Sequence, residues 1–290
     1  MMKALYSGVS GMRSHQTKMD VIGNNIANVN TNGYKAQRTT FRDIYYQTMS
    51  TPTAPSDDGT IVRGGTNSSQ VGYGAQVGSI DTIHTLSGYA PTNKSTDLYI
   101  NGEGYFMVED ASGVPFYTRY GAFNFDSAGN MVDSNGNKVL GLNMDDVDSG
   151  VTDGEMSNVE AIVIDEYDRY KNITINADGT ISAYDMDATD PDDTVVTIGQ
   201  VAVAYVPNQN ALVLEGNSYY SAGNNTGDIT FHEPGLVGTG AIVTGGLEMS
   251  NVDLANEFSD MIVTQRGFQA NTKIISVVDQ MLEELVNLKR

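Results

Sequence analysis

The chain lacks cysteine, has only 7 prolines among its 290 residues, and contains no apolar run of about 18 residues. The absent cysteine excludes disulfides and thiolate metal sites. The absent apolar run excludes a membrane-spanning helix. The opening segment, MMKALYSGVSGMRSHQ, also lacks the continuous apolar stretch of a cleavable signal peptide, so none is expected. With 40% hydrophobic residues the chain can build a core, which argues against disorder throughout.

Positive charge is scarce, with 16 Lys and Arg against 36 Asp and Glu and a net charge of −20. This balance argues against a nucleic-acid partner, because phosphates bind a positive surface. The charge is unevenly distributed: residues 1–49 carry +4, residues 50–250 carry −22 and residues 251–290 carry −2. We therefore expect a solvated acidic centre and two ends that can contact other protein.

Both ends of the chain predict long amphipathic helices. Apolar residues at 3–4 spacing predict a helix from about residue 3 to 29, which Gly8, Gly11 and Gly23 weaken by about 1 kcal/mol each relative to alanine. A second helix is predicted over about 254–288, with Asn251 or Asp253 as its N-cap. The two stripes favour pairing with each other or with other chains as a coiled coil. An ordinary two-helix layer on a sheet fits the same pattern.

The centre of the sequence predicts short antiparallel strands. LYINGEGYFMVED predicts a hairpin, DSAGN and DSNGN predict turns of a meander, and NITINADGTISAYD predicts another hairpin. Residues 50–70 are polar and rich in Pro and Gly, which predicts a linker or loop. The expected fold is α+β, with a coiled-coil-like pair of terminal helices and a central, mainly antiparallel β domain. The expected domains are 1–30 plus 254–290 (helices), 31–95 plus 235–253 (connections) and 96–234 (β domain).

The sequence predicts no catalytic site, no cofactor site and no metal site. His15, His84 and His232 have no ligand spacing. NGEGYF lies in a predicted hairpin and not between a strand and a helix, so it is not a phosphate loop. The acidic stretch DMDATDPDD and the turn DSNGN lack the register of a calcium loop, and a solvated acidic surface is the simpler interpretation. We therefore expect a protein that is not an enzyme.

Both ends and part of the centre resemble the bacterial flagellar axial proteins, which are rod, hook and hook-associated subunits. The resemblance lies in ALYSGVSGMRSHQTKMDVIGNNIANVNTNGYKAQ, in GGLEMSNVDLANEFSDMIVTQRGFQANTKIISVVDQMLEELVNLKR, and in the central DLYINGEGYFMV and YTRYGAFNFDSAGNMVDSNGNKVLG. It implies a homopolymeric tube lined by paired helices, with the β domain outside. It also implies terminal helices that fold on assembly, and a protein without membrane insertion.

Within this family the chain is most similar to a short hook protein, because TQRGFQAN is closer to hook subunits. A distal rod subunit is the alternative, since such subunits carry an extra segment near residues 50–70. The implied location is the hook or basal body, reached by type III export without a cleaved signal peptide. The implied partners are neighbouring rod and hook-filament junction proteins, a hook cap and the export apparatus. A competing interpretation, a secreted carbohydrate-active or calcium-binding β protein on a helical stalk, predicts a defined oligomer.

The asparagine-rich stretch NNIANVNTNGYK follows the first predicted helix. Amides donate and accept together, so we expect the asparagines to bond where the helix ends and meets neighbouring subunits, with Gly33 allowing the left-handed turn that stops it. A simple capped helix end is the alternative. The predicted assembly residues are Leu5, Val9, Met12, Met19, Ile22, Asn24, Asn25, Ile26, Asn28, Asn30, Gly33, Leu254, Phe258, Met261, Gln265, Phe268, Ile275, Leu282 and Leu285.

Overall fold

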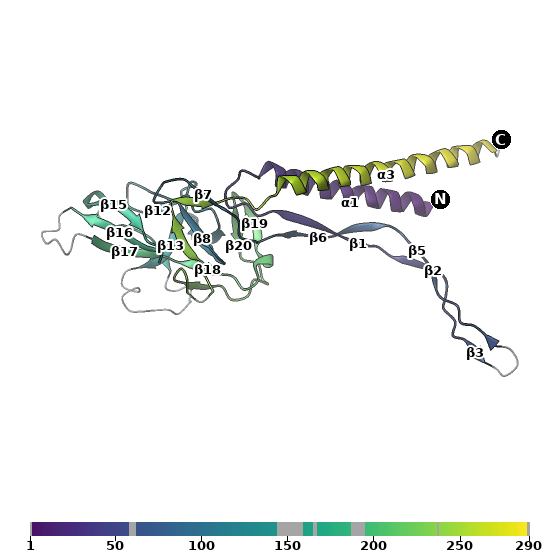
Figure 1. The fold of residues 1–290 in the computed structure, drawn as a ribbon, viewed down its shortest axis with the longest axis horizontal. Coiled ribbons are helices and arrows are strands. Elements are labelled where there is room, and N and C mark those ends of the chain that lie inside the picture. Colours follow the sequence, from purple (N-terminus) through teal and green to yellow (C-terminus); the bar gives the residue numbers. More distant parts are fainter. Residues whose placement is uncertain are drawn as a thin grey trace. The chain divides into compact units, whose positions relative to one another are not determined.

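The structure is a computed structural model that describes residues 2–57, 62–143, 159–164, 167–186, 195–236 and 238–288. The chain forms two compact units. The first, the helical unit, comprises Met1–Ala27, Gln37–Ile83 and Val252–Arg290; the second, the β unit, comprises Asn28–Ala36 and His84–Asn251. The fold is α+β, as predicted, with two terminal helices and a mainly antiparallel β domain (Figure 1). The chain passes between the units four times.

The helical unit is built on two helices, α1 (Met2–Ala27) and α3 (Leu254–Leu288). They lie side by side and antiparallel, because Gly8 faces Ile275 whereas Asn25 contacts Glu257 (Figure 1). Both predicted helices are confirmed within about two residues. Asp253 caps α3, since its Oδ1 accepts from the Ala255 amide at 2.9 Å. Coiled-coil packing of the two helices stays a prediction.

A long two-stranded ribbon completes the helical unit. Strand β1 (Gln37–Asp43) pairs with β6 (Ala75–Thr82), β2 (Tyr46–Ser50) with β5 (Ser69–Gly72), and β3 (Ser56–Asp57) with β4 (Val62–Arg63). The prediction of a linker or loop over 50–70 is therefore only partly right. It holds for residues 51–55 and 64–68, which belong to no strand apart from the Thr53–Thr66 bridge, and it is wrong for the described residues of β2 to β5. Hydroxyl pairs tie the strands together, such as Thr40 to Ser79 at 2.7 Å and Thr53 to Thr66 at 2.6 Å. Such cross-strand pairs stabilise a ribbon of polar composition.

The β unit contains an antiparallel sheet whose main order is β15-β16-β17-β13-β9-β10-β20-β19. Two further pairs, β22 with β8 and β23 with β7, belong to the same unit. The bounds are β7 Tyr89–Pro91, β8 Leu98–Asn101, β9 Tyr105–Glu109, β10 Pro115–Thr118, β11 Asn124–Phe125, β12 Met131–Val132, β13 Lys138–Asn143, β14 Glu160–Ala161, β15 Tyr170–Ile175, β16 Thr180–Asp185, β17 Val195–Val201, β18 Val203–Tyr205, β19 Val213–Gly216, β20 Tyr219–Ser221, β21 Thr230–His232, β22 Ala241–Thr244 and β23 Gly246–Glu248.

Most of the predicted strand pairs exist, with one exception. NITINADGTISAYD forms the β15–β16 hairpin, and DSAGN and DSNGN form the turns of the β11–β12–β13 meander, as predicted. The hairpin predicted over LYINGEGYFMVED is wrong. Its two halves are strands, but β8 pairs with β22 whereas β9 pairs with β10, β13 and β18.

Strand β9 is the centre of the core. Its side chains alternate between two hydrophobic clusters, with Phe106 and Val108 in one and Tyr105 and Met107 in the other. Because successive side chains of a strand point to opposite faces, one strand buried on both faces connects the two clusters. This core places the loops that hold the buried polar network described below.

Candidate assembly surface and buried polar sites

Glycines allow α1 and α3 to approach closely. A Cβ built on Gly8 would lie 3.2 Å from Ile275 Cγ1, and one on Gly11 would lie 2.8 Å from Asn271 Nδ2. A Cβ on Gly267 would lie 2.7 Å from the His15 ring. Sequence reasoning treated Gly8 and Gly11 only as weaknesses of the helix. The structure gives them a packing role at the helix interface.

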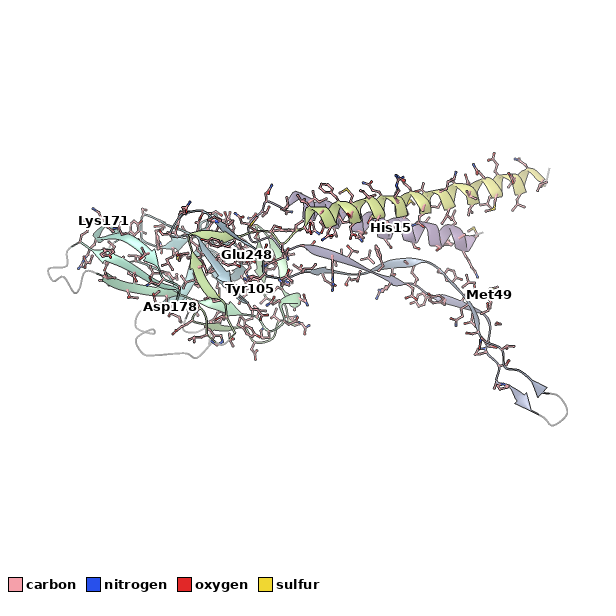
Figure 2. All side chains as sticks on the ribbon, in the orientation of Figure 1. His15, Met49, Tyr105, Lys171, Asp178 and Glu248 are labelled. Atoms are coloured by element: carbon pink, nitrogen blue, oxygen red, sulfur yellow. The ribbon has the colours of Figure 1, made fainter. Side chains whose placement is uncertain are left out.

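His15, labelled in Figure 2, lies on α1. Its ring fills the space that Gly267 of α3 leaves open. Its ring packs edge-on against Phe41 of β1, with centroids 5.7 Å apart. Burial and, secondarily, the nearby Lys18 lower the pKa of His15. Lys18 itself pairs with Asp260 of α3, with Nζ and Oδ2 3.0 Å apart. A neutral imidazole therefore joins α1, α3 and the ribbon.

The predicted assembly residues of the two helices are only partly covered in a single chain. Ile22 and Asn25 are buried, at 3% and 1% exposure, whereas Phe258 and Leu285 are 50% and 49% exposed. Asn24, Leu254 and Gln265 are also exposed, and the partly buried members are Leu5, Val9, Met12, Met19, Ile26, Met261, Phe268, Ile275 and Leu282.

Further apolar side chains of α3 point away from α1. Ile262 is 59% exposed, Val263 66% and Val286 67%. Exposed apolar surface of this extent marks a site of interaction with other protein. The role of these side chains in assembly stays a prediction.

Asn25 is a buried amide that joins three segments of the helical unit. Its Nδ2 donates to the Gln37 carbonyl at 2.8 Å and to Glu257 Oε1 at 3.0 Å. Its Oδ1 accepts from the Gln37 amide at 3.0 Å. Burial raises the pKa of Glu257, and the bond from Asn25 opposes that rise. The amide at residue 25 thus connects the end of α1, the start of β1 and the start of α3 within one chain.

From Asn28 onward the asparagine-rich stretch belongs to the β unit. Gly33 adopts the predicted left-handed conformation, with φ of +71°. However, α1 ends at Ala27, so Gly33 does not stop the helix. Its amide donates to the Glu248 carbonyl at 2.8 Å, and a Cβ there would lie 2.9 Å from the Tyr120 amide. Close approach to a neighbouring backbone explains the glycine.

Three charged side chains form a buried network in the β unit. Lys35 Nζ lies 2.6 Å from Glu248 Oε1, and Arg119 Nη1 lies 3.4 Å from Glu248 Oε2. The side chains are 0%, 1% and 3% exposed for Lys35, Glu248 and Arg119. Lys35 also donates to the Thr85 carbonyl at 2.8 Å, and the Ser87 amide donates to Glu248 Oε1 at 3.2 Å. Desolvation lowers the pKa of Lys35, and the pairing with Glu248 opposes it.

An aromatic group borders the buried network (Figure 2). Arg119 Cζ lies 5.1 Å from the centre of the Tyr105 ring, and the Tyr105 hydroxyl lies 2.8 Å from His84 Nδ1. Burial and the nearby Lys35 and Arg119 lower the pKa of His84 to about 4, whereas burial raises the pKa of Tyr105. The Tyr220 ring centroid lies 5.7 Å from that of Tyr105 and 5.8 Å from that of His84, and burial raises the pKa of Tyr220 as well. All three rings are thus neutral near pH 7. Sequence reasoning missed this site, since its members are scattered along the chain.

The described residues contain no group of three His, Asp or Glu side chains placed to hold a metal ion. Asp133 of the DSNGN turn instead accepts from the amides of Asn135 and Asn137 at 2.8 and 3.0 Å. Most of the acidic stretch DMDATDPDD lies outside the described residues. Across the described part of the chain, neither helix combines the length and the apolar character that crossing a membrane requires.

Three segments match known protein families. Residues 5–35 match "Flagella basal body rod protein", residues 99–183 match "Flagellar hook protein FlgE/F/G D1 domain", and residues 243–288 match "Flagellar basal body rod FlgEFG protein C-terminal". Over its full length the chain is also 43% identical across 291 positions to all of the flagellar basal-body rod protein FlgG of Bacillus subtilis. The chain belongs to the flagellar hook and rod family of axial proteins. It is therefore a structural component of the flagellar hook or basal body.

Relatives with both names occur in one organism, Borreliella burgdorferi. Its hook protein FlgE is 29% identical over 446 positions, and its rod protein FlgG is 33% identical over 290 positions; each alignment covers all of both chains. Membership of the family thus leaves two finer roles, hook subunit and rod subunit.

Proposed function

We propose that the chain is the subunit of the flagellar hook, the curved joint that transmits motor torque to the filament. The subunits polymerise into a tube through the helical unit. The partners that follow are copies of the same chain, the adjoining rod and hook-filament junction proteins, a hook cap during growth and the type III export apparatus. The proposal rests mainly on the comparison between the two Borreliella relatives.

The number of identical residues favours the hook protein. An alignment of this 290-residue chain over 446 positions must include long gaps. Its 29% of 446 positions corresponds to about 129 identical residues. For the rod protein of the same organism, 33% of 290 positions corresponds to about 96. Because both relatives come from one species, the distance between organisms does not explain the difference. The hook-like TQRGFQAN segment in α3 supports the same assignment.

A rod subunit is the second candidate, on two observations. The Bacillus relative named as a rod protein shares 43% of 291 positions, about 125 residues, and matches this chain in length. The ribbon between β1 and β6 lies where the family's distal rod subunits carry their extra segment. Such a ribbon suits a straight and rigid shaft.

The charges of the two units suit a tube with a helical interior. Counted on the sequence, the helical unit carries 10 Lys and Arg against 11 Asp and Glu, for a net charge of −1, whereas the β unit carries 6 against 25, for −19. A nearly neutral unit with exposed apolar side chains can pack closely with copies of itself. A strongly acidic unit repels its copies and remains hydrated. Weak contacts between β units would allow a curved tube to rotate about its own axis.

The test places the chain within the flagellum. An epitope is inserted in the exposed turn at Ala111–Ser112, the variant replaces the gene in the bacterium that encodes it, and isolated hook-basal bodies are labelled with gold. Gold along the curved segment, together with rods that lack hooks in a deletion strain, supports the hook. Gold only on the straight shaft would assign the chain to the rod.

A further inference from the structure

The chain crosses between its two units at four peptide bonds, 27–28, 36–37, 83–84 and 251–252. Any force that passes through the chain from one unit to the other must pass through residues beside these bonds. In each unit a single asparagine side chain joins the segments that lead to the crossings. The two asparagines are Asn25 in the helical unit and Asn251 in the β unit.

In the helical unit, Asn25 lies two residues before the first crossing. It exchanges two hydrogen bonds with the backbone of Gln37, the residue immediately after the second crossing. Its third bond goes to Glu257, five residues after the fourth crossing. Gln37 in turn pairs with Thr82, one residue before the third crossing. The three segments of this unit have four ends at the crossings, and all four ends are thereby linked.

In the β unit, Asn251 occupies the position directly before the fourth crossing. Its Oδ1 accepts from the amide of Ala36 at 2.6 Å, on the near side of the second crossing. Its Nδ2 donates to Thr85 Oγ1 at 3.1 Å, just after the third crossing. The neighbouring Lys35 reinforces the link through its bond to the Thr85 carbonyl. The Ser87 hydroxyl adds a bond to the Ser250 carbonyl at 2.8 Å.

We propose that Asn25 and Asn251 are positioning residues that carry torque between the two units. Segments tied side by side share a load in parallel, so several hydrogen bonds must break together. Untied segments would be peeled away one after another. An amide suits this position because it donates and accepts at once and joins backbones without a buried charge. This inference rests on the proposed function in one respect, namely that the subunit transmits rotation. Hook subunits and rod subunits both do so.

The test separates assembly from resistance to load. Asn25→Ala and Asn251→Ala are introduced singly into the gene, with Asn224→Ala in an exposed loop as the matched control. Hook-basal bodies are counted by electron microscopy in cells with paralysed motors and in cells that rotate in viscous medium. Each hydrogen bond lost should favour local opening about fivefold. We expect normal numbers in paralysed cells, several-fold more broken structures in rotating cells, and no change in the control.

A milder variant keeps the test decisive if Asn251→Ala does not fold. Thr85→Val removes the side-chain acceptor of Asn251 and leaves the backbone bond from Lys35 in place, so a weaker form of the same load-dependent breakage is expected. Equal losses with paralysed and rotating motors would show a purely folding role. Intact structures under load would show that the links carry no torque. Either result overturns the proposal. The proposed function is tested separately by where the structures break, because a break in the curved hook supports a hook subunit and a break in the straight rod supports a rod subunit.

Discussion

The buried network of Lys35, Glu248 and Arg119 predicts an unequal response to removing its charges. It contains two cations and one anion, all at most 3% exposed. Glu248→Gln removes the shared partner and leaves two buried cations facing each other. Lys35→Met removes one cation and leaves the Arg119–Glu248 pair, which still receives the Ser87 amide. The loss of the anion should therefore destabilise the β unit far more than the loss of the lysine.

The magnitudes follow from the cost of uncompensated buried charge. Removing one partner of a buried ion pair costs about 3–5 kcal/mol when the other charge is left unpaired, and Glu248→Gln meets this condition for both cations. Lys35→Met instead loses two hydrogen bonds, to Glu248 and to the Thr85 carbonyl. That loss amounts to about 1–3 kcal/mol, part of which the apolar methionine offsets. Because domains are stable by about 5–15 kcal/mol, the glutamate variant should approach global unfolding.

Urea denaturation of the purified chain measures both values. The near-ultraviolet circular dichroism of buried Tyr105 and Tyr220 reports on the β unit itself, whatever the state of the terminal helices. We expect the urea midpoint to fall at least twice as far for Glu248→Gln as for Lys35→Met, with an unchanged slope. An equal or larger fall of the urea midpoint for Lys35→Met would refute the reasoning. It would mean that leaving the two buried cations without their shared anion has no extra cost.

Three further predictions use single substitutions. Gly23→Ala places a methyl group that meets no atom within 4 Å, so it should stabilise assembled structures by about 1 kcal/mol. Gly267→Ala places a methyl group against the His15 ring, so it should destabilise them by about 1–2 kcal/mol. Thermal melting followed by circular dichroism at 222 nm measures both, and equal rises in melting temperature would contradict this prediction. Gly33→Ala should destabilise the β unit in urea by about 2 kcal/mol or more, since its φ is +71°. The free energy of unfolding should fall by about 2 kcal/mol between pH 6.5 and 4, because His84 has a pKa of about 4 in the folded state and therefore takes up its proton first in the unfolded state; solvent screens part of this effect. His84→Gln should make the free energy of unfolding depend less on pH in this range. An unchanged pH dependence in that variant would refute the assignment to His84.

The long helices were predictable because their signals are local. The 3–4 spacing of apolar side chains repeats over many turns, and α3 begins directly after Asp253, which caps it. The turns DSAGN and DSNGN were predictable for a similar reason, since Asp and Gly favour specific turn conformations. The ribbon was missed because Pro, Gly, Ser and Thr between 50 and 70 also suit a loop. Its stability comes from cross-strand pairs such as Thr53 with Thr66, which a single sequence does not reveal.

The buried sites depended on contacts between distant positions. Lys35 and Glu248 are 213 positions apart, and Arg119 and Glu248 are 129 apart. A single charged residue in a sequence is usually solvated, so nothing marked these three. The asparagine-rich stretch did draw attention to Asn25, and the contacts of this stretch with neighbouring subunits stay a prediction. Asn25 is buried within its own chain, and Gly33 serves a close backbone approach.

The central claim is that the chain polymerises into an axial tube through its terminal helices. The most direct test adds purified chain, concentrated in high salt, to sheared hook fragments as seeds, next to a copy lacking residues 1–30, with electron microscopy of both. We predict tubes that grow from the seeds with the full chain only, curved if it forms the hook and straight if it forms the rod. Two results would contradict the account. In one, the seeds do not grow and the full chain remains a compact, protease-resistant monomer with ordered ends. In the other, the copy lacking residues 1–30 also forms tubes.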